Sequence, residues 1–320
     1  MAVYQSGSRG EEVVRIQTKL RSLGHYKGPL DGEFGGGTEA AVKAFQKAHK
    51  LEVDGKVGPI TWDALFSEAI PTPAIRDKPL NHRCLALTGA FETGAGVPDC
   101  FAGLSGDFDG QGISFGVLQW NFGQGSLQPL LKDMVKKHGK AVKSIFQEHY
   151  DVLLAALNSD QDEQMDFARS IQHPLKHFLY EPWRGMLKSL GRTEEFQGIQ
   201  LEYAAGLFRS ALDLCSTFDL RSARAAALMF DIKVQNGSIS DLVRAQILRD
   251  FGGLPPGMPK EDLEVRRMVI VANRRAEAAN PRWVEDVRAR KLCIATGEGV
   301  VHGIPYHIEE QFGISLGPIS

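Results

Sequence analysis

Residues 91–121, FETGAGVPDCFAGLSGDFDGQGISFGVLQWN, mark the point where a helical pattern changes into the pattern of a small sheet. The apolar run 85–91 stops at Thr93 and Gly94, and glycine commonly closes helices because it accepts a left-handed backbone. A glycine-rich loop follows. Residues 113–119 then alternate apolar side chains with small or apolar neighbours, which predicts a strand or one arm of a hairpin.

The carboxyl groups of this stretch occupy two different settings. Glu92 follows an apolar segment, whereas Asp107 and Asp109 lie among glycines, 15 and 17 positions later (107 − 92 and 109 − 92). Glycoside hydrolysis uses one carboxyl in an apolar setting that raises its pKa, and a second carboxyl that stays ionised in a more polar setting. The contrast favours this chemistry. The alternative is a helix-capping glutamate followed by ordinary Asp-Gly turns.

The run 108–114 resembles the chitosanase-type branch of the lysozyme-like glycosidases. In that branch a helix ends in the acid glutamate, and a Gly-Asp-Gly-x-Gly-aromatic/aliphatic-Thr segment carries the base. The resemblance implies Glu92 as the general acid, Asp109 as the general base and Ser114 as the hydroxyl that holds the attacking water. Phe108 stands where the pattern has its first glycine, and Ser114 stands in place of threonine. Asp107 is an alternative second carboxylate.

Bulk composition excludes several classes of protein. The chain has 320 residues, 43% of them hydrophobic and 24% charged, with a net charge of −2, so no nucleic-acid or anionic-membrane partner is expected. No stretch approaches the ~20 apolar residues of a membrane-spanning helix. The N-terminus has no basic segment followed by an apolar one, so we expect a chain made in the cytoplasm without a signal peptide.

The four cysteines, Cys84, Cys100, Cys215 and Cys293, are scattered. Free thiols are the expectation for a chain made in the cytoplasm, although a bridge between Cys84 and Cys100 around the Glu92 loop is an alternative. The histidines show no metal-ligand spacing, so neither a catalytic metal nor another cofactor is expected.

An internal repeat marks residues 1–68 as a separate unit. The motif Asp-Gly-x-apolar-Gly-x-x-Thr occurs at Asp31–Thr38 and again at Asp54–Thr61, offset by 23 (54 − 31). Each copy predicts a tight turn with its threonine as the N-cap of a helix, over 39–49 and 62–68, after an amphipathic helix that ends at Gly24. The inward side chains of this three-helix bundle are expected to be Val42, Phe45, Leu51, Val53, Trp62 and Leu65.

The same segment closely resembles the peptidoglycan-binding domain of bacterial wall hydrolases. The matching positions are Gly7–Gly10, Val14, Gln17, Leu20, Asp31-Gly32, Thr38–Val42 and Phe45-Gln46. The resemblance implies affinity for the wall, through a groove near Tyr26, Asp31, Phe34 and Thr38. The alternative is a helical module that binds protein or nothing.

The rest of the chain is expected to be one large domain. Residues 69–79 contain three prolines and predict a semi-rigid extended linker, so the catalytic domain is expected over 80–320. Helical periodicity recurs after Asn121, with Ser126 as an N-cap and a central buried helix over 195–217. The fold class is therefore mainly α: a small three-helix bundle joined to a lysozyme-like α+β domain with one small sheet.

Three clusters beyond the catalytic stretch are candidates for sugar binding. Amide and hydroxyl groups of amino sugars require hydrogen-bonding side chains, and an aromatic ring offers a platform for a pyranose. The segment 288–303 is glycine-rich and is either the far wall of a cleft or a plain loop. For the cluster at 235–236 the alternative is a polar helix C-cap, and for the cluster at 119–121 it is a core tryptophan. The candidate residues are Gln119, Trp120 and Asn121, then Gln235 and Asn236, then Glu298.

These observations predict a peptidoglycan hydrolase of the lysozyme type, a muramidase that cleaves the β-1,4 bond after N-acetylmuramic acid. The expected partner is bacterial peptidoglycan and the expected state is a monomer. A chain of this kind resembles a phage endolysin, and an injected antibacterial effector fits as well. The alternatives are a lytic transglycosylase, which needs only Glu92, a chitosanase-like aminoglycan hydrolase, and a non-catalytic wall-binding protein.

Overall fold

The computed structural model describes residues 3–71 and 74–319. These residues are mainly helical and divide into two compact units, one made of Met1–Leu87 with Phe208–Ser320 and the other of Thr88–Leu207. The expected boundaries at residues 68 and 80 stay a prediction. Within the described residues no helix is long and apolar enough to cross a membrane.

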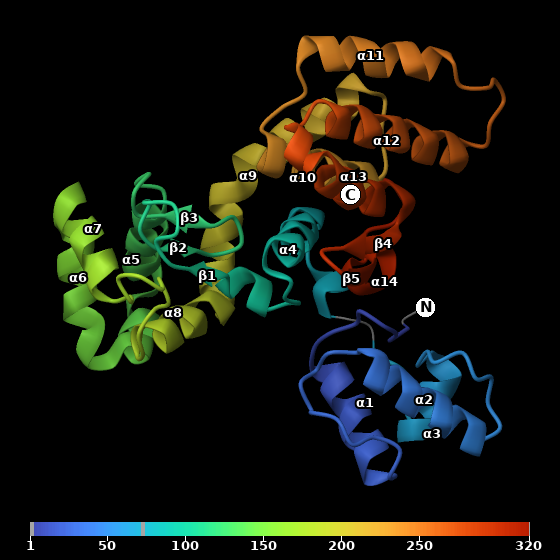
Figure 1. Cartoon of the computed structure of the whole chain (residues 1–320), viewed down its shortest axis with the longest axis horizontal. Coiled ribbons are helices and arrows are strands. Elements are labelled where there is room, and N and C mark those ends of the chain that lie inside the picture. Colours follow the sequence, from blue (N-terminus) through green and yellow to red (C-terminus); the bar gives the residue numbers. More distant parts are fainter. Residues whose placement is uncertain (1–2, 72–73, 320) are drawn as a thin grey trace. The chain divides into compact units, whose positions relative to one another are not determined.

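The N-terminal bundle consists of α1 (Glu11–Ser22), α2 (Gly36–Ala48) and α3 (Pro59–Phe66), coloured in blues in Figure 1. Its core confirms four of the six predicted inward side chains, namely Val42, Phe45, Trp62 and Leu65. Leu51 is half-buried and packs against this core. Val53 was expected inward but is 50% exposed, because it precedes the second turn motif and belongs to no helix.

The two threonines of the repeat do not cap helices. Helices α2 and α3 begin earlier than predicted, with Gly35 and Gly58 at their N-caps, so Thr38 and Thr61 lie in the first turn. Their hydroxyls instead meet buried glutamines: Gln17 Nε2 lies 3.3 Å from Thr38 Oγ1, and the corresponding bond in the second copy is 3.2 Å long.

Each glutamine organises one copy of the repeat. Gln46 donates from Nε2 to Asp54 Oδ1 at 2.8 Å and to the Lys56 carbonyl at 2.9 Å, while its Oε1 accepts the Gly55 N–H at 2.9 Å. Gln17 makes the same contacts to Asp31, Glu33 and Gly32 in the first copy. The repeat is therefore a repeated hydrogen-bond network, and its buried polar groups are paired as folding requires.

The segment expected to be an extended linker is only partly described. Thr72 and Pro73 lie outside the described residues, and Ala74–Asp77 form a short 3₁₀ helix, η1. At that point the chain is turned rather than extended.

Helix α4 (Leu80–Thr93) leads into the unit Thr88–Leu207. This unit contains a three-stranded antiparallel sheet of order β1-β2-β3, whose strands are Leu104–Ser105, Ser114–Phe115 and Trp120–Asn121. The predicted strand over 113–119 is thus shorter, because Gln119 adopts a positive φ and turns the chain between β2 and β3. This unit also contains η2 (Asp99–Ala102), α5 (Leu127–Phe146), α6 (Tyr150–Asn158), α7 (Gln161–Ser170) and α8 (Trp183–Arg192), and Figure 1 draws the sheet next to the green α5.

The long central helix is present as α9 (Glu194–Thr217). After it come α10 (Ala223–Asn236), α11 (Asp241–Gly252), α12 (Lys260–Glu277) and α13 (Val284–Thr296). The segment 288–303, which we expected to be a glycine-rich loop or cleft wall, is the end of α13 followed by β4 (Glu298–Val301) and the turn of a hairpin. The second strand of that hairpin is β5 (Ile304–His307), and α14 (Ile308–Phe312) follows it. The second sheet was not predicted.

Candidate functional site

Glu92 lies in the last turn of α4. Phe91 beside it is buried, and Gly94 closes the helix with a φ of 67°, as the sequence predicted. Thr93 bends back and donates from Oγ1 to the Gly89 carbonyl at 2.7 Å. The side chain of Glu92 is exposed, which differs from the apolar setting we expected, because the helix places it one position beyond the buried Phe91.

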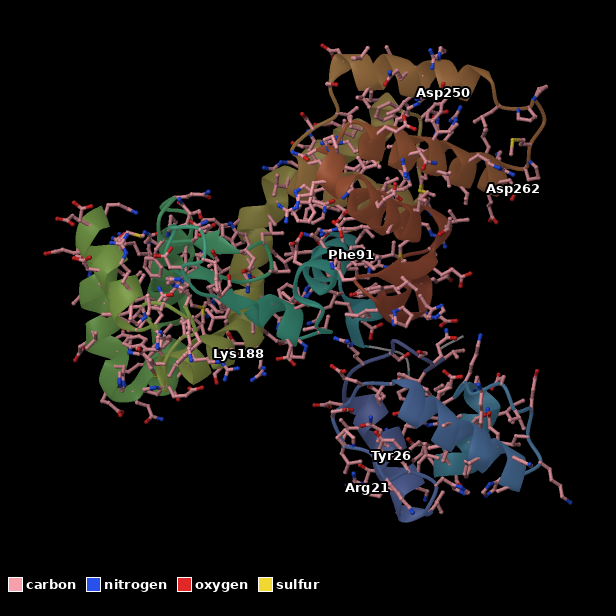
Figure 2. The ribbon with its side chains drawn as sticks, in the orientation of Figure 1. Arg21, Tyr26, Phe91, Lys188, Asp250 and Asp262 are labelled. Carbon is pink, nitrogen blue, oxygen red and sulfur yellow. The ribbon has the colours of Figure 1, made fainter. Side chains whose placement is uncertain are left out.

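Glu92 lines a pocket with a volume of about 640 Å³. The pocket is formed by the end of α4, the helix η2, the strand β1 and the second half of α8, where Figure 2 labels Lys188. Its lining is Glu92, Thr93, Ala95, Asp99, Ala102, Gly103, Leu104, Ser105, Gln119, Lys188 and Arg192. A concave site with several hydrogen-bonding and charged side chains is suited to a polar ligand such as a sugar.

Close packing at Gly103 shapes this pocket. A Cβ at that position would lie 2.7 Å from Thr93 Cγ2 and 2.8 Å from Gln119 Nε2, so a larger residue would displace these side chains. Gln119 is one of the predicted sugar-binding residues and lines the pocket. Its Oε1 accepts from Ser105 Oγ at 3.0 Å and its Nε2 donates to the Gly116 carbonyl at 2.9 Å, which fixes the amide in place.

Two cations and a second carboxylate in the lining were missed by sequence reasoning. Arg192 contacts Asp99 through both Nε and Nη2, at 2.7 and 2.6 Å from Oδ1. Lys188 lies one helical turn before Arg192, so both reach the same face of α8. The spacing of Lys188 and Arg192 in the sequence indicates that they share one face of a helix. It does not indicate that this face meets η2, because only the tertiary fold brings α8 to η2.

Asp107 is held by its own loop. Its side chain is 13% exposed, and Oδ1 accepts the Gly112 N–H at 2.8 Å while Arg169 Nε lies 3.7 Å from Oδ2. The Asp107 N–H donates to Gln172 Oε1 at 2.8 Å. These contacts tie the loop after β1 to the end of α7.

Asp109 and Ser114 differ in exposure. Asp109 is exposed, and its Oδ1 accepts the Gln111 N–H at 3.1 Å in a local turn. Ser114 is buried in β2, opposite Ser105 of β1. Among the described residues that line the Glu92 pocket, neither Asp107 nor Asp109 is present.

The other two residues of the 119–121 cluster have structural contacts. Trp120 is half-buried against the core of its unit. Asn121 is buried; its Oδ1 accepts the Gln124 N–H at 2.8 Å and its backbone N–H donates to Ser126 Oγ at 2.9 Å. Ser126 therefore stands at the predicted N-cap of α5 but contacts the preceding turn instead of the helix, for which the structure has no side-chain capping bond.

The candidates Gln235, Asn236 and Glu298 belong to the unit that contains the chain's C-terminal part. Gln235 Oε1 accepts from Lys291 Nζ at 2.6 Å, and Asn236 is the last residue of α10. Glu298 lies on β4, with Oε2 3.6 Å from His307 Nδ1. The segment 230–236 thus forms the last turns of α10, which ends at Asn236 with Gly237 as its C-cap, and the role of its polar side chains in sugar binding stays a prediction.

A buried ionic cluster lies on the preceding turn of α10. Asp231 pairs with Arg290 at 2.6 Å and with Lys291, and all three side chains are at most 1% exposed. Burial raises the pKa of Asp231, but the two cations lower it by more, to about 2. The cluster joins α10 to α13.

The N-terminal bundle has a second pocket, of about 560 Å³. Three of the four residues predicted for a wall-binding groove, Tyr26, Asp31 and Thr38, are in its lining. Hydrogen bonds from the Glu33 N–H and from Gln17 lower the pKa of Asp31. Phe34 instead points into the core and is 1% exposed, because it occupies the apolar position of the repeat.

All four cysteines are free and buried, so the expectation of free thiols is confirmed and the alternative bridge between Cys84 and Cys100 is absent from the described chain. Burial raises the pKa of each thiol, to about 12 for Cys215 and Cys293. Thiols of this kind are inert.

Comparison with known proteins places the N-terminal bundle in a family. Residues 9–65 match the family model described as "Putative peptidoglycan binding domain". A spore cortex-lytic enzyme from Oceanobacillus iheyensis is 44% identical over 63 residues, which are 20% of this chain and 23% of that protein. An N-acetylmuramoyl-L-alanine amidase from Mycobacterium tuberculosis is 39% identical over 57 residues, 18% of this chain and 14% of that protein. The chain thus spans under a quarter of the length of these curated relatives.

Similar solved structures include a native chitosanase from Bacillus subtilis MY002, at 18% identity and a TM-score of 0.42, covering 69% of this chain and 88% of that one. A Burkholderia AP3 phage endolysin covers 90% of this chain and 98% of its own at 14% identity and a TM-score of 0.20. Residues 9–65 thus form a domain of the peptidoglycan-binding family.

Proposed function

We propose that the chain is a peptidoglycan hydrolase that cleaves the glycan strand, with Glu92 as the general acid. The observation that carries the proposal is the position of Glu92 in the lining of a polar pocket, in a chain whose N-terminal bundle matches the peptidoglycan-binding family. A binding domain raises the local concentration of a tethered catalytic domain at the surface of its substrate.

The charges in the pocket favour a wall glycan over chitosan as the substrate. Chitosan is a polycation, and a site for it would be dominated by carboxylates. The lining instead balances Glu92 and Asp99 with Lys188 and Arg192. N-acetylmuramic acid carries a lactyl carboxyl group, which Lys188 attracts when it is not blocked by a peptide, since Arg192 is paired with Asp99. We propose that the cleaved bond is the β-1,4 bond after N-acetylmuramic acid, as in a muramidase.

The second carboxylate of the proposed hydrolysis is Asp109. A general base must be ionised and open to water, and Asp109 is exposed with one short local contact. Asp107 is the weaker candidate, because Gly112 and Arg169 already occupy its carboxylate. Ser114 is assigned to hold the attacking water. A separation of ~6.5–9.5 Å between the acid and the base in the bound state corresponds to inversion, and ~5–5.5 Å to retention.

A lytic transglycosylase is a second candidate, favoured by a specific observation. Among the described residues that line the pocket, the carboxylates are Glu92 and Asp99, and Asp99 is paired with Arg192. A transglycosylase needs only the acid, since the substrate supplies the internal nucleophile and the product has an anhydro end.

Product analysis with Asp109→Asn and Asp107→Asn separates the two candidates. A muramidase that uses Asp109 releases reducing muramic acid ends, and Asp109→Asn lowers its rate by about 10²–10⁴-fold while Asp107→Asn acts mainly on stability. Anhydro ends from the parent chain, with both variants fully active, would establish the transglycosylase instead.

A further inference from the structure

An aromatic surface lies beside the loop that carries Asp107 and Asp109. Its exposed members are Phe108, which is 72% exposed, and Phe178 and Tyr180, which are 49% and 39% exposed. Leu175 extends the surface and is 83% exposed. Phe108 is also the residue that departs from the glycosidase pattern, where a glycine is found, so the feature belongs to this chain rather than to that pattern.

The rings of this surface are arranged by direct contacts. Phe108 lies edge-on to the imidazole of His177, with 5.1 Å between ring centroids. Phe178 packs against His173 at 5.0 Å and against Tyr180 at 5.6 Å. We name Phe108, Leu175, His177, Phe178 and Tyr180 the aromatic platform. The rings contact one another, and Phe108, Phe178 and Tyr180 remain exposed to solvent.

The backbone beneath the platform is fixed. His173 donates its N–H to the Phe178 carbonyl at 2.8 Å, and its Nδ1 accepts the N–H groups of Leu175 and Lys176 at 3.1 Å. His177 holds a φ of 53°, which is uncommon outside glycine. A surface whose side chains are already ordered loses less conformational entropy when it binds a ligand.

The backbone of the platform contacts the loop that carries Asp107 and Asp109. A Cβ at Gly106 would lie 1.8 Å from the His177 carbonyl oxygen, so the loop after β1 touches the platform's backbone. Asp107 adds a bond from its N–H to Gln172, which precedes His173 in the chain. Ser105, the last residue of β1, lines the Glu92 pocket. Phe108 follows Ser105 after Gly106 and Asp107, so a short loop connects the pocket lining to the platform.

We propose that the aromatic platform is an additional subsite that binds pyranose rings of the glycan strand beyond the Glu92 pocket. The inference rests on the proposed function for its substrate class. Aromatic faces bind the apolar CH face of a sugar, while the imidazole and phenol groups of the platform donate or accept hydrogen bonds at the ring edge. A polymer that spans several rings gains affinity from such a surface, and a short oligomer does not reach it.

The test titrates peptide-free glycan oligomers into the full chain carrying Glu92→Gln, which prevents turnover. Calorimetry compares a tetrasaccharide and an octasaccharide with the parent side chain, Phe108→Ala, Phe108→Leu and Phe108→Trp. Trp283→Ala serves as the matched control, because Trp283 is an exposed aromatic residue (52%) of the other unit. The N-terminal bundle contributes equally in every variant.

We expect Phe108→Ala and Phe108→Leu to weaken binding of the octasaccharide by about five- to tenfold, the range of one aromatic contact. Binding of the tetrasaccharide is unchanged, and Phe108→Trp and Trp283→Ala keep the parent affinity. Equal affinities of all variants for the octasaccharide would overturn the subsite, even with the parent chain active on peptidoglycan. A platform effect in a chain that cleaves no glycan would leave the subsite standing and reject the proposed hydrolase.

Two further outcomes would also overturn the proposed glycan subsite. No binding of either oligomer by any variant overturns the subsite together with the substrate class. A dimer in sedimentation that Phe108→Ala dissociates, with glycan affinity unaltered, would identify the platform as a surface for a second copy of the chain.

Discussion

Arg192 of α8 meets a single carboxylate oxygen, Asp99 Oδ1, with both Nε and Nη2, at 2.7 and 2.6 Å. The pair joins η2 to α8 at the rim of the Glu92 pocket and uses the charge of Arg192 within the protein. Exposed pairs of this kind contribute little to stability, about 0.2–1 kcal/mol. Because Asp99 already pairs with Arg192, Lys188 is the cation in the lining that is better placed to meet an anionic substrate.

Lys188→Met is therefore expected to raise KM for peptide-free glycan strands about two- to fivefold, with kcat unchanged, since an exposed charge contact is worth about 0.5–1 kcal/mol. Lys132→Met, an exposed lysine of α5, is the matched control and leaves KM as it was. Conversion of the lactyl carboxyl groups to amides removes the difference between Lys188→Met and the parent. A difference that persists on the amidated strands would contradict a charge contact to that carboxyl.

The pocket of the N-terminal bundle offers a test of wall binding that spares the core. Ala40 is exposed and lines this pocket, while Ala44 is exposed one turn further along α2 and is absent from the lining residues described. Ala40→Trp is expected to fill the pocket and weaken sedimentation with purified peptidoglycan by about tenfold, a difference of roughly 1.4 kcal/mol. Ala44→Trp keeps the parent binding. If both variants bound peptidoglycan equally weakly, or if both bound it as the parent does, the wall-binding surface would lie outside this pocket.

The buried cluster on α10 predicts both a stability loss and a pH dependence. Asp231→Asn leaves Arg290 and Lys291 buried without their anion, so the free energy of unfolding in urea is expected to fall by about 3–5 kcal/mol. Asp213→Asn, at an exposed position of α9, is the control and changes it little.

In the parent chain the pKa of Asp231 is lowered from 3.8 to about 2. A carboxyl with a lowered folded-state pKa contributes stability that is present above the unfolded value and lost as pH falls through the folded one. The contribution of Asp231 is thus complete above pH 4 and lost between about pH 4 and pH 2. Unfolding curves of the parent and of Asp231→Asn should converge over that window; a constant gap would contradict the assignment.

Local patterns predicted the helices well, because apolar spacing and closing glycines act within a few residues. Gly24 and Gly94 both adopt positive φ just beyond their helices, and Gly94 leaves Glu92 in the final turn as expected. The repeat of Asp31 and Asp54 was also visible. Its threonines were misassigned as caps because Gly35 and Gly58 start the helices earlier.

The pocket itself depends on contacts that no local pattern reveals. Asp99 and Arg192 are 93 positions apart, and Gln200 reaches from α9 to accept the Val117 N–H at 2.7 Å and donate to the Phe101 carbonyl at 3.1 Å. Such a glutamine looks like any polar residue of an amphipathic helix. Its burial follows only from the packing of α9 against η2 and the small sheet.

The most direct test of the central claim is the release of soluble muropeptides from purified peptidoglycan by the parent chain and by Glu92→Gln, with mass spectrometry of the product ends. We predict reducing ends on muramic acid from the parent, and a loss of about 10²–10⁴-fold in rate for Glu92→Gln with wall binding unchanged. Equal release by the two proteins would contradict the assignment of Glu92 as the acid.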